Sequence, residues 1–297
     1  ANGMGAMLDA DDALNRHEWL LAPLLLQGSQ SPDARILLAL PLDIEALIAA
    51  CPALLQQSDS VEWDDVKGTL KAFRRSRIGQ LTVRVQPLAK PSEAELHQAM
   101  LNGIRDKGLD VLNWTTQARQ LRLRLHCAAK WLPEDEWPAV DDAALLAELE
   151  HWLLPQMSGV HSLRALKALD LYAALLAWLP WPLRQRLVSS LPEHYTVPTG
   201  SQIAIRYHED NPPALAVRMQ EMFGEATTPS IAQGRVALVL ELLSPAQRPL
   251  QITRDLAAFW QGAYPEVQKE MKGRYPKHVW PDDPANTAPT RRTKKYS

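Results

Sequence analysis

Short apolar runs separated by turn-forming residues dominate the first ninety positions of the chain. Residues 81–85 alternate between apolar and polar side chains, the period-two pattern of a strand with one buried face. Leu42–Ala50 has the pattern of a short helix, which Pro52 ends. The expected strands are Trp19–Leu26, Arg35–Leu40, Val61–Trp63, Thr69–Ile78 and Leu81–Val85. Several short strands with one helix predict a small OB-like β-barrel domain over residues 1–91.

From residue 92 the apolar positions follow the period of helices. Ser92 and Glu95 form a capping box that opens the first helix, and Gly108 follows its end. Thr115 or Thr116 caps the next helix. The expected helices are Ala94–Lys107, Thr116–Lys130, Asp141–Leu154, Ser162–Leu179 and Leu183–Leu191. We therefore expect a helical middle domain over residues 92–191.

Strand patterns return after Pro192. The expected strands are Tyr195–Val197, Gln202–Tyr207, Ala214–Val217 and Arg235–Leu243, with short helices at Arg218–Phe223 and from Asp255 onward. These elements predict a mixed α/β C-terminal domain over residues 192–280. Residues 281–297 are rich in Pro, Asn and Thr and then basic, so we expect an extended basic tail. The predicted fold class is α+β.

Composition narrows the class of protein. The 297 residues are 46% apolar, enough for a sizeable core, and 32 basic residues nearly balance 34 acidic ones. A nucleic-acid surface must therefore be a local patch. The two cysteines, Cys51 and Cys127, cannot form a disulfide framework and suit a reducing compartment. No apolar stretch is long enough to span a bilayer and no signal peptide is visible, so we expect a soluble cytoplasmic protein without membrane contact. The sequence begins at Ala1 within a predicted strand and turn, which predicts a piece of a longer protein.

The familiar catalytic motifs do not occur in this sequence. It has no phosphate loop of the Walker type, no H-E-x-x-H motif and no G-x-S-x-G nucleophile elbow. The eight histidines are scattered, and Cys127 beside His126 points to another side of the same helix. Asp141 and the other paired acids are explained by caps and loops. We therefore assign no catalytic, cofactor-binding or metal-binding residue to this chain.

One segment concentrates basic residues. Between Asp65 and Glu93 there is no acidic residue, but there are seven lysines and arginines, Lys67 and Lys90 among them. The candidate nucleic-acid contacts in this segment are Lys71, Phe73, Arg74, Arg75, Arg77 and Arg84. In a hairpin from Thr69 to Val85, alternate parity puts Lys71, Phe73, Arg75 and Arg77 on one face, with Arg84 on the returning strand. Cations and an aromatic ring on one face can follow a phosphate backbone and stack a base. The competing interpretation is a solvated edge strand that its charges protect from aggregation.

Two further groups extend this hypothesis. Residues 111–132 contain no acid, and Arg119 and Arg122 lie one helical turn apart within them. In the C-terminal block, residues 253–281, aromatic and basic residues interleave, and the tail adds more basic residues. The candidate contacts there are Arg274, Lys277, Arg291 and Arg292, with Lys294 and Lys295 following. For Trp260 and Trp280 we favour positions in the core.

The C-terminal block also resembles a known family. Its segments 253–260 (TRDLAAFW), 273–278 (GRYPKH) and 280–284 (WPDDP) closely resemble the C-terminal region of HrpB-type bacterial ATP-dependent helicases, which are relatives of the DEAH/RHA helicases. The likeness continues upstream through residues 242–245 (LLSP), 197–201 (VPTGS) and 162–171 (SLRALKALDL), as far as residues 2–6 (NGMGA). It therefore covers essentially the whole chain.

This resemblance implies a helicase whose two RecA-like motor domains lie upstream of Ala1. ATP and Mg²⁺ would bind in those domains, and helicase activity would belong to the intact protein. Relatives in the DEAH/RHA group carry an OB-like domain after the motor that helps to hold RNA. The resemblance assigns no role to individual residues of the family-specific C-terminal region.

Two functions remain open at this stage. The first is a non-catalytic part of an RNA helicase that binds single-stranded RNA or DNA beside the motor domains. The second is a protein-interaction module that docks a protein partner or the motor domains. Its support is the set of tryptophans at positions 131, 137, 152, 178 and 181, since aromatic residues are enriched at interfaces, although we favour ordinary core positions for them. No group of residues supports a separate enzymatic activity.

Overall fold

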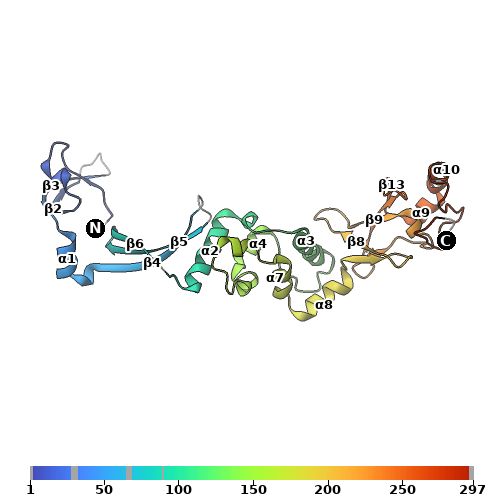
Figure 1. The fold of residues 1–297 in the computed structure, drawn as a ribbon, viewed down its shortest axis with the longest axis horizontal. Coiled ribbons are helices and arrows are strands. Elements are labelled where there is room, and N and C mark those ends of the chain that lie inside the picture. The colour runs from blue at the N-terminus through green and yellow to red at the C-terminus, as the bar shows by residue number, and fades with distance from the viewer. Residues whose placement is uncertain (1–2, 28–32, 65–68, 89, 294–297) are drawn as a thin grey trace. The chain divides into compact units, whose positions relative to one another are not determined.

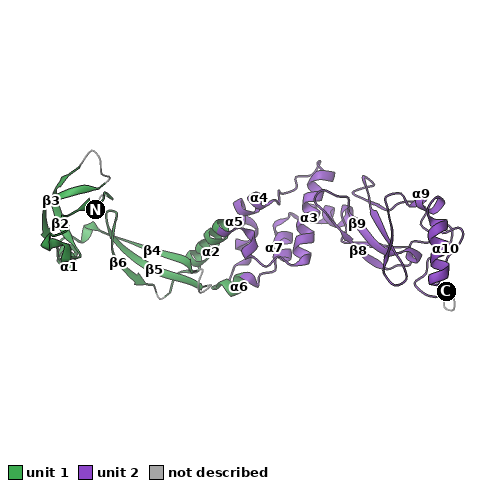
Figure 2. Cartoon of the chain, turned by 90° about the horizontal axis from the view of Figure 1, so that it is seen from above, with its two compact units in different colours: residues 1–106, 159–166 green, residues 107–158, 167–297 purple. Residues whose placement is uncertain are grey.

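The computed structural model describes residues 3–27, 33–64, 69–88 and 90–293 (Figure 1). The chain divides into two compact units (Figure 2). Unit 1 consists of residues 1–106 and 159–166, and unit 2 of residues 107–158 and 167–297. The three domain boundaries expected from the sequence stay predictions.

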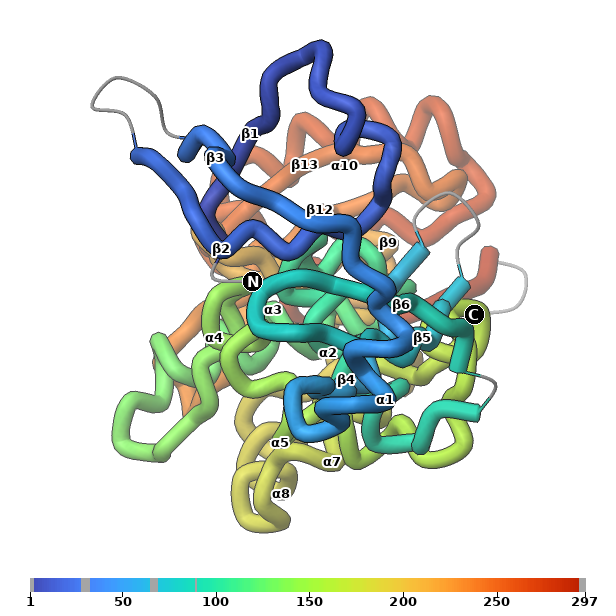
Figure 3. The backbone as a smooth tube through the Cα atoms, turned by 90° about the vertical axis from the view of Figure 1, so that its left-hand side faces the viewer, coloured from blue at the N-terminus to red at the C-terminus, as the bar shows by residue number. Residues whose placement is uncertain are grey.

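Unit 1 begins with a three-stranded sheet in the order β1-β3-β2. Its strands are β1 (Ala6–Met7), β2 (Leu20–Leu26) and β3 (Ala34–Pro41), and the short 3-10 helix η1 (Ala13–Arg16) lies between β1 and β2. Strand β3 runs parallel to β1 and antiparallel to β2, and Figure 3 shows β2 and β3 as neighbours. Helix α1 (Ile44–Ala50) follows, with the Asp43 carboxylate accepting hydrogen bonds from the backbone of its first turn.

The second sheet of unit 1 is an antiparallel meander, β4-β5-β6. After the 3-10 helix η2 (Pro52–Leu54), strands β4 (Leu55–Asp64) and β5 (Thr69–Ile78) pair in register from Leu55↔Ile78 to Asp64↔Thr69. Strand β6 (Leu81–Pro87) returns along β5, with a register shift between Ser76 and Arg77. Gly79 adopts φ 59° in the connecting turn, a backbone conformation that glycine accommodates without strain.

The structure does not confirm the OB-like barrel. The predicted strands form, but in the described part of unit 1 they belong to two separate open sheets. An OB barrel needs continuous hydrogen bonding around a closed circuit of strands. Here α1 and η2 separate β3 from β4 along the chain, and β4 has β5 as its only strand partner among the described residues.

Helix α2 (Glu93–Lys107) packs against the second sheet. Ser92 and Glu95 form the predicted capping box, in which the Ser92 backbone donates to the Glu95 carboxylate and the Glu95 backbone donates to the Ser92 hydroxyl. The Trp63 ring of β4 lies so close to Gly103 that a Cβ atom at this position would stand 2.3 Å from Trp63 Cε3. Glycine at position 103 is therefore a packing requirement.

The first part of unit 2 is helical, as predicted, with more breaks than expected. Its elements are η3 (Leu109–Val111), α3 (Thr116–Trp131), α4 (Asp142–Ala147), α5 (Leu149–Trp152), η4 (Leu154–Gln156), α7 (Leu171–Trp178) and α8 (Trp181–Ser190), while α6 (Leu163–Lys167) lies largely in unit 1. The single helix expected over 162–179 is interrupted because Asp170 accepts hydrogen bonds from Tyr172 and Ala173, capping a new helix. Leu121, Leu125 and Leu175 are fully buried in the helical core.

The second part of unit 2 is a five-stranded sheet in the order β13-β12-β9-β8-β7. Its strands are β7 (His194–Thr196), β8 (Gln202–Arg206), β9 (Ala214–Arg218), β12 (Val239–Leu243) and β13 (Pro249–Thr253), and β10 (Ser230–Ile231) pairs separately with β11 (Val236–Ala237). The 3-10 helix η5 (Met219–Glu221) and helices α9 (Leu256–Gln261) and α10 (Tyr264–Arg274) complete it. Phe223, Phe259, Trp260 and Tyr264 form a buried aromatic cluster. Residues 281–293 contain neither helix nor strand.

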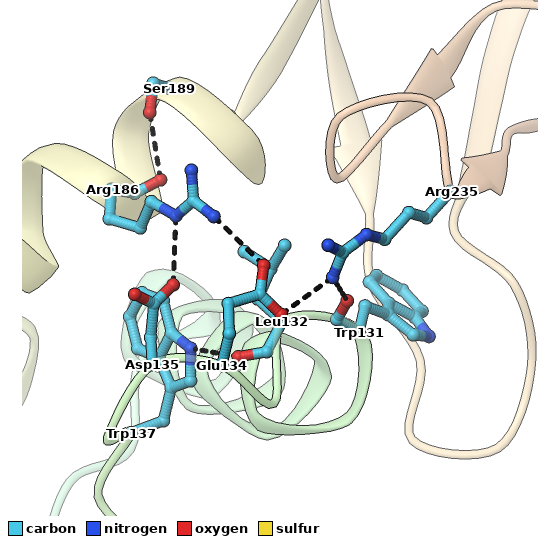
Figure 4. Close-up of polar contacts among 8 residues, drawn as sticks. All are labelled: Trp131, Leu132, Glu134, Asp135, Trp137, Arg186, Ser189 and Arg235. Atoms are coloured by element: carbon cyan, nitrogen blue, oxygen red, sulfur yellow. Dashed lines mark hydrogen bonds and ion pairs between the residues drawn. The ribbon is translucent and has the colours of Figure 1, made fainter.

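A charged network joins the helical and β parts of unit 2 (Figure 4). Arg186 of α8 donates to the carboxylates of Asp135 (2.9 Å) and Glu134 (3.1 Å). Arg235, which directly precedes β11, donates hydrogen bonds of 2.8 Å to the Glu134 carboxylate and to the Trp131 carbonyl. The hydrogen bond from Arg235 holds the pKa of Glu134 below its usual value. The middle and C-terminal parts are thus held together within one compact unit.

Among the helices that the structure describes, none is both long and apolar enough to cross a membrane.

Candidate nucleic-acid interface

The two faces of the β4-β5-β6 sheet follow from its register. Cross-strand partners share a face, so Lys71, Phe73, Arg75 and Arg77 lie on one side of β5, as predicted. We call this side the odd face, because its β5 residues have odd numbers. The opposing β4 residues on the same face are Glu62, Ser60, Ser58 and Gln56. Arg84 pairs with Ser76 and so shares the other face, with Arg74. Arg84 lies on the returning strand, and the register shift between Ser76 and Arg77 places it on the face opposite Arg77.

Acidic residues of β4 neutralise much of the basic segment. On the odd face, Lys71 pairs with Asp64 at 2.5 Å, and Arg75 bonds to Glu62 at 2.5 Å and to the Ser60 hydroxyl at 2.8 Å. These acids precede the basic segment in the sequence and meet it only through strand pairing, so the charge pattern along the chain does not reveal them. Pairing residues 55–64 with residues 69–78 as an antiparallel hairpin would have placed these acids opposite the basic residues.

The opposite face is neutralised in the same way. Arg74 donates two hydrogen bonds of 2.8 Å to the Asp59 carboxylate. These bonds hold the pKa of Asp59 below its ordinary value and raise that of Arg74. Arg84 forms an ion pair with Glu45 of α1. Both arginines are therefore engaged within the protein.

Arg77 differs from the other cations of the hairpin. It is exposed, and its cross-strand neighbours, Gln56 of β4 and Thr82 of β6, carry no charge. In the described part of the chain it has no ion-pair partner. Nearby on the same face, the Arg75 guanidinium lies 6.0 Å from the centre of the Phe73 ring. The odd face thus becomes cationic toward its Arg77 end.

The second predicted group, Arg119 and Arg122 on α3, lines a cavity of about 570 Å³ in unit 2. Arg119 is exposed and donates to the Trp114 carbonyl at 3.3 Å. Arg122 donates to the Val140 carbonyl (2.5 Å) and to Asp142 (2.6 Å). The structure therefore brings these two arginines to one site, in unit 2, whereas the hairpin belongs to unit 1.

The C-terminal candidates are dispersed over unit 2. Arg274 is exposed at the end of α10 and lies 3.7 Å from Glu270. Lys277 and Arg292 are exposed, and Arg291 donates to the Ser201 hydroxyl at 3.3 Å. Trp260 and Trp280 are buried in the core, as expected. Lys67, Lys294 and Lys295 lie outside the described residues.

Burial determines the reactivity of Cys127. Desolvation raises the pKa of its thiol to about 11, so the thiolate that nucleophilic chemistry requires is disfavoured. No cluster of three or more His, Cys, Asp or Glu side chains able to hold a metal occurs in the described segments.

Comparison with known proteins relates this architecture to a family. Residues 152–284 match a family model described as the C-terminal part of an ATP-dependent helicase, and residues 54–88 match the connector region of the ATP-dependent RNA helicase HrpB. The ATP-dependent RNA helicase HrpB of Escherichia coli K12 is 81% identical to the chain over all 297 residues. The chain belongs to the HrpB helicase family. The resemblance inferred from the C-terminal block is thereby confirmed.

Two solved HrpB structures resemble the whole chain. A crystal structure of the E. coli DExH-box NTPase HrpB superposes with a TM-score of 0.72 at 81% identity, covering 98% of this chain and 36% of that one. A second crystal structure, of the E. coli DEAH/RHA helicase HrpB, gives a TM-score of 0.64 at 74% identity. The match covers 94% of this chain and 35% of that one. The chain spans 37% of the length of its curated HrpB relative.

Proposed function

We propose that this chain is a non-catalytic C-terminal part of an HrpB-type RNA helicase and contributes to its grip on single-stranded nucleic acid. The family match supports the helicase context. The sequence contains no phosphate loop, so ATP and Mg²⁺ would bind in RecA-like motor domains outside these 297 residues. The chain would assist those domains by holding the strand.

The observation that carries this proposal is the Arg77 end of the odd face. An exposed guanidinium without an acidic partner can bind a phosphate at little cost, because no existing ion pair has to break. The Arg75–Phe73 pair beside it offers a cation and an aromatic ring. Lys71 and Arg75 can also bind the phosphate backbone only if each exchanges its carboxylate partner for a phosphate.

Replacing Arg77 with glutamine should weaken binding of single-stranded RNA and flatten its salt dependence. Removing one phosphate contact lowers the slope of log K against log salt by roughly 0.7 on a single strand. Arg74→Gln is the matched control, since it removes the same charge from the same strand but from the paired face. Fluorescence anisotropy with a labelled oligoribonucleotide at several salt concentrations measures both slopes. Equal slopes for the two variants would exclude Arg77 as a specific contact.

A second candidate function rests on the exposed leucines of the β1-β3-β2 sheet. Leu24 and Leu38 are cross-strand partners and each is 52% exposed. The other large apolar side chains exposed on these strands are Met7, Leu21, Leu25, Leu26, Leu37 and Leu40. Soluble proteins rarely leave so many large apolar residues together in water. We propose that the remainder of the full-length protein packs on this sheet, which corresponds to the docking alternative of the sequence analysis.

Leu24→Glu should therefore affect the full-length protein and the 297-residue chain differently. In the full-length helicase it should lower the melting temperature, because the carboxylate would be buried in an apolar contact. In the shorter chain it should leave the melting temperature unchanged and reduce binding of a hydrophobic dye. Val188→Glu on α8, where Val188 is 62% exposed, controls for a general effect of added charge. An unchanged full-length protein would show that the sheet is not covered.

A further inference from the structure

The cavity beside α3 is built differently from the hairpin face. Trp114, Arg119, Arg122 and Val140 contribute to its wall, together with Glu209 from the loop after β8. Its volume of about 570 Å³ falls in the range of pockets that hold a small planar ligand. These five residues lie in unit 2, so the cavity is formed within one compact unit.

Arg122 is held in a fixed orientation at this cavity. Its guanidinium lies 5.5 Å from the centre of the Trp114 ring, and the indole nitrogen of Trp114 is anchored by a 3.0 Å hydrogen bond to the Leu109 carbonyl. The Val140 carbonyl and the Asp142 carboxylate accept hydrogen bonds from two of its nitrogens. Arginine planes oriented in this way are surfaces on which unpaired RNA bases stack.

The acids at the cavity determine which part of a nucleotide can enter. Asp141, Asp142 and Glu209 give it three carboxylates against the two arginines, so a phosphate group would be repelled from its interior. Asp142 is engaged by Arg122, and Asp141 caps α4. Glu209 is exposed and makes no hydrogen bond or ion pair with another described residue. An available carboxylate accepts hydrogen bonds and does not donate them, so its ligand must present donors.

We propose that this cavity binds a guanine base of single-stranded RNA, with the base stacked on Arg122 and read by Glu209. Guanine alone among the four bases presents two adjacent donors, N1–H and the exocyclic amine, on its Watson–Crick edge, and these match the two oxygens of a carboxylate. Exposed Arg119 then contacts the backbone phosphate outside the cavity. This inference rests on the proposed binding of single-stranded nucleic acid and adds a base preference to it.

The test compares two labelled oligoribonucleotides, UUUGUUU and UUUAUUU, by fluorescence anisotropy with the 297-residue chain. We expect the guanine strand to bind about tenfold more tightly, the low end of the discrimination that a bidentate contact gives. Glu209→Gln should abolish the preference, because an amide offers one acceptor in place of two. Asp210→Asn, at the neighbouring exposed position outside the cavity, should retain it.

The outcomes separate this inference from the proposed function. Equal affinity of the wild-type chain for both strands would overturn the guanine site and leave strand binding intact. Retention of the preference in Glu209→Gln would likewise overturn it. Arg77→Gln should weaken the binding of both oligoribonucleotides equally, since Arg77 would contact the phosphate backbone and not the bases. Absence of binding to either strand at low salt would overturn both proposals.

Discussion

Gly103→Ala is expected to destabilise unit 1 although alanine is the better helix former. The new Cβ would stand 2.3 Å from Trp63 Cε3 and 3.0 Å from Cζ3, far inside van der Waals contact. The indole cannot move away freely, because β4 is paired with β5 over ten residues. Overpacking of this kind costs about 1–3 kcal/mol, and more than offsets the roughly 1 kcal/mol that alanine gains over glycine in a helix. We expect a net loss of up to about 2 kcal/mol.

Gly273→Ala in α10 provides the matched comparison. Gly273 is also helical, and nothing lies within 4 Å of the position that its Cβ would take. The same substitution should therefore raise the free energy of unfolding, by up to about 1 kcal/mol. Urea unfolding followed by circular dichroism measures both, and hydrogen exchange in α2 and β4 locates the loss. Stabilisation by both substitutions would contradict the packing of Trp63 on Gly103.

Arg124→Met is expected to destabilise unit 2 more than any exposed charge substitution. Arg124 is 3% exposed and donates to the Leu191 carbonyl (3.0 Å) and to Glu193 (2.6 Å). Glu193 also accepts a hydrogen bond from the Tyr172 hydroxyl at 2.7 Å. Methionine fills part of the volume but leaves the Leu191 carbonyl without this buried donor, whereas Glu193, whose side chain is 44% exposed, keeps its hydrogen bond from Tyr172. Leaving one buried carbonyl without its donor costs about 1–3 kcal/mol.

Arg206→Met is the control for the loss of an arginine ion pair. Arg206 pairs with Glu241, but its side chain is 49% exposed, so water can replace the contact. Its loss should change the free energy of unfolding by less than about 1 kcal/mol. Urea unfolding of both variants measures the difference. Equal effects would show that the burial of Arg124 adds nothing to stability.

Local patterns predicted the elements of this fold better than their assembly. Thr69–Ile78 is predicted and observed with the same bounds, because the turn-forming residues that flank a strand are a local property of the sequence. The barrel failed because closure depends on pairing between distant strands, which no local pattern encodes. Strand β13 was missed: Pro249 begins it, and proline is unfavourable in a strand interior. Trp260 and Trp280 are core, as expected, and Phe259 and Tyr264 are buried as well.

The candidate site shows the same limit. The odd face of β5 followed from parity alone, and the register confirms that Lys71, Arg75 and Arg77 share it. The ion pairs with Glu62 and Asp64 could not be predicted from parity, since those acids meet the basic residues only across the sheet. The HrpB family was recognised from extended sequence runs, which carry more information than charge.

The central claim is that this chain holds single-stranded RNA by its own cations, and titration of a labelled oligoribonucleotide at two salt concentrations tests it most directly. We predict micromolar affinity at low salt and a steep loss as the salt concentration increases, toward the dissociation constants of about 10⁻⁴–10⁻⁶ M that non-specific contacts give at physiological salt. No change in anisotropy at low salt would contradict it. The basic hairpin would then be a solvated, ion-paired surface, and docking through the leucine sheet would be the remaining function.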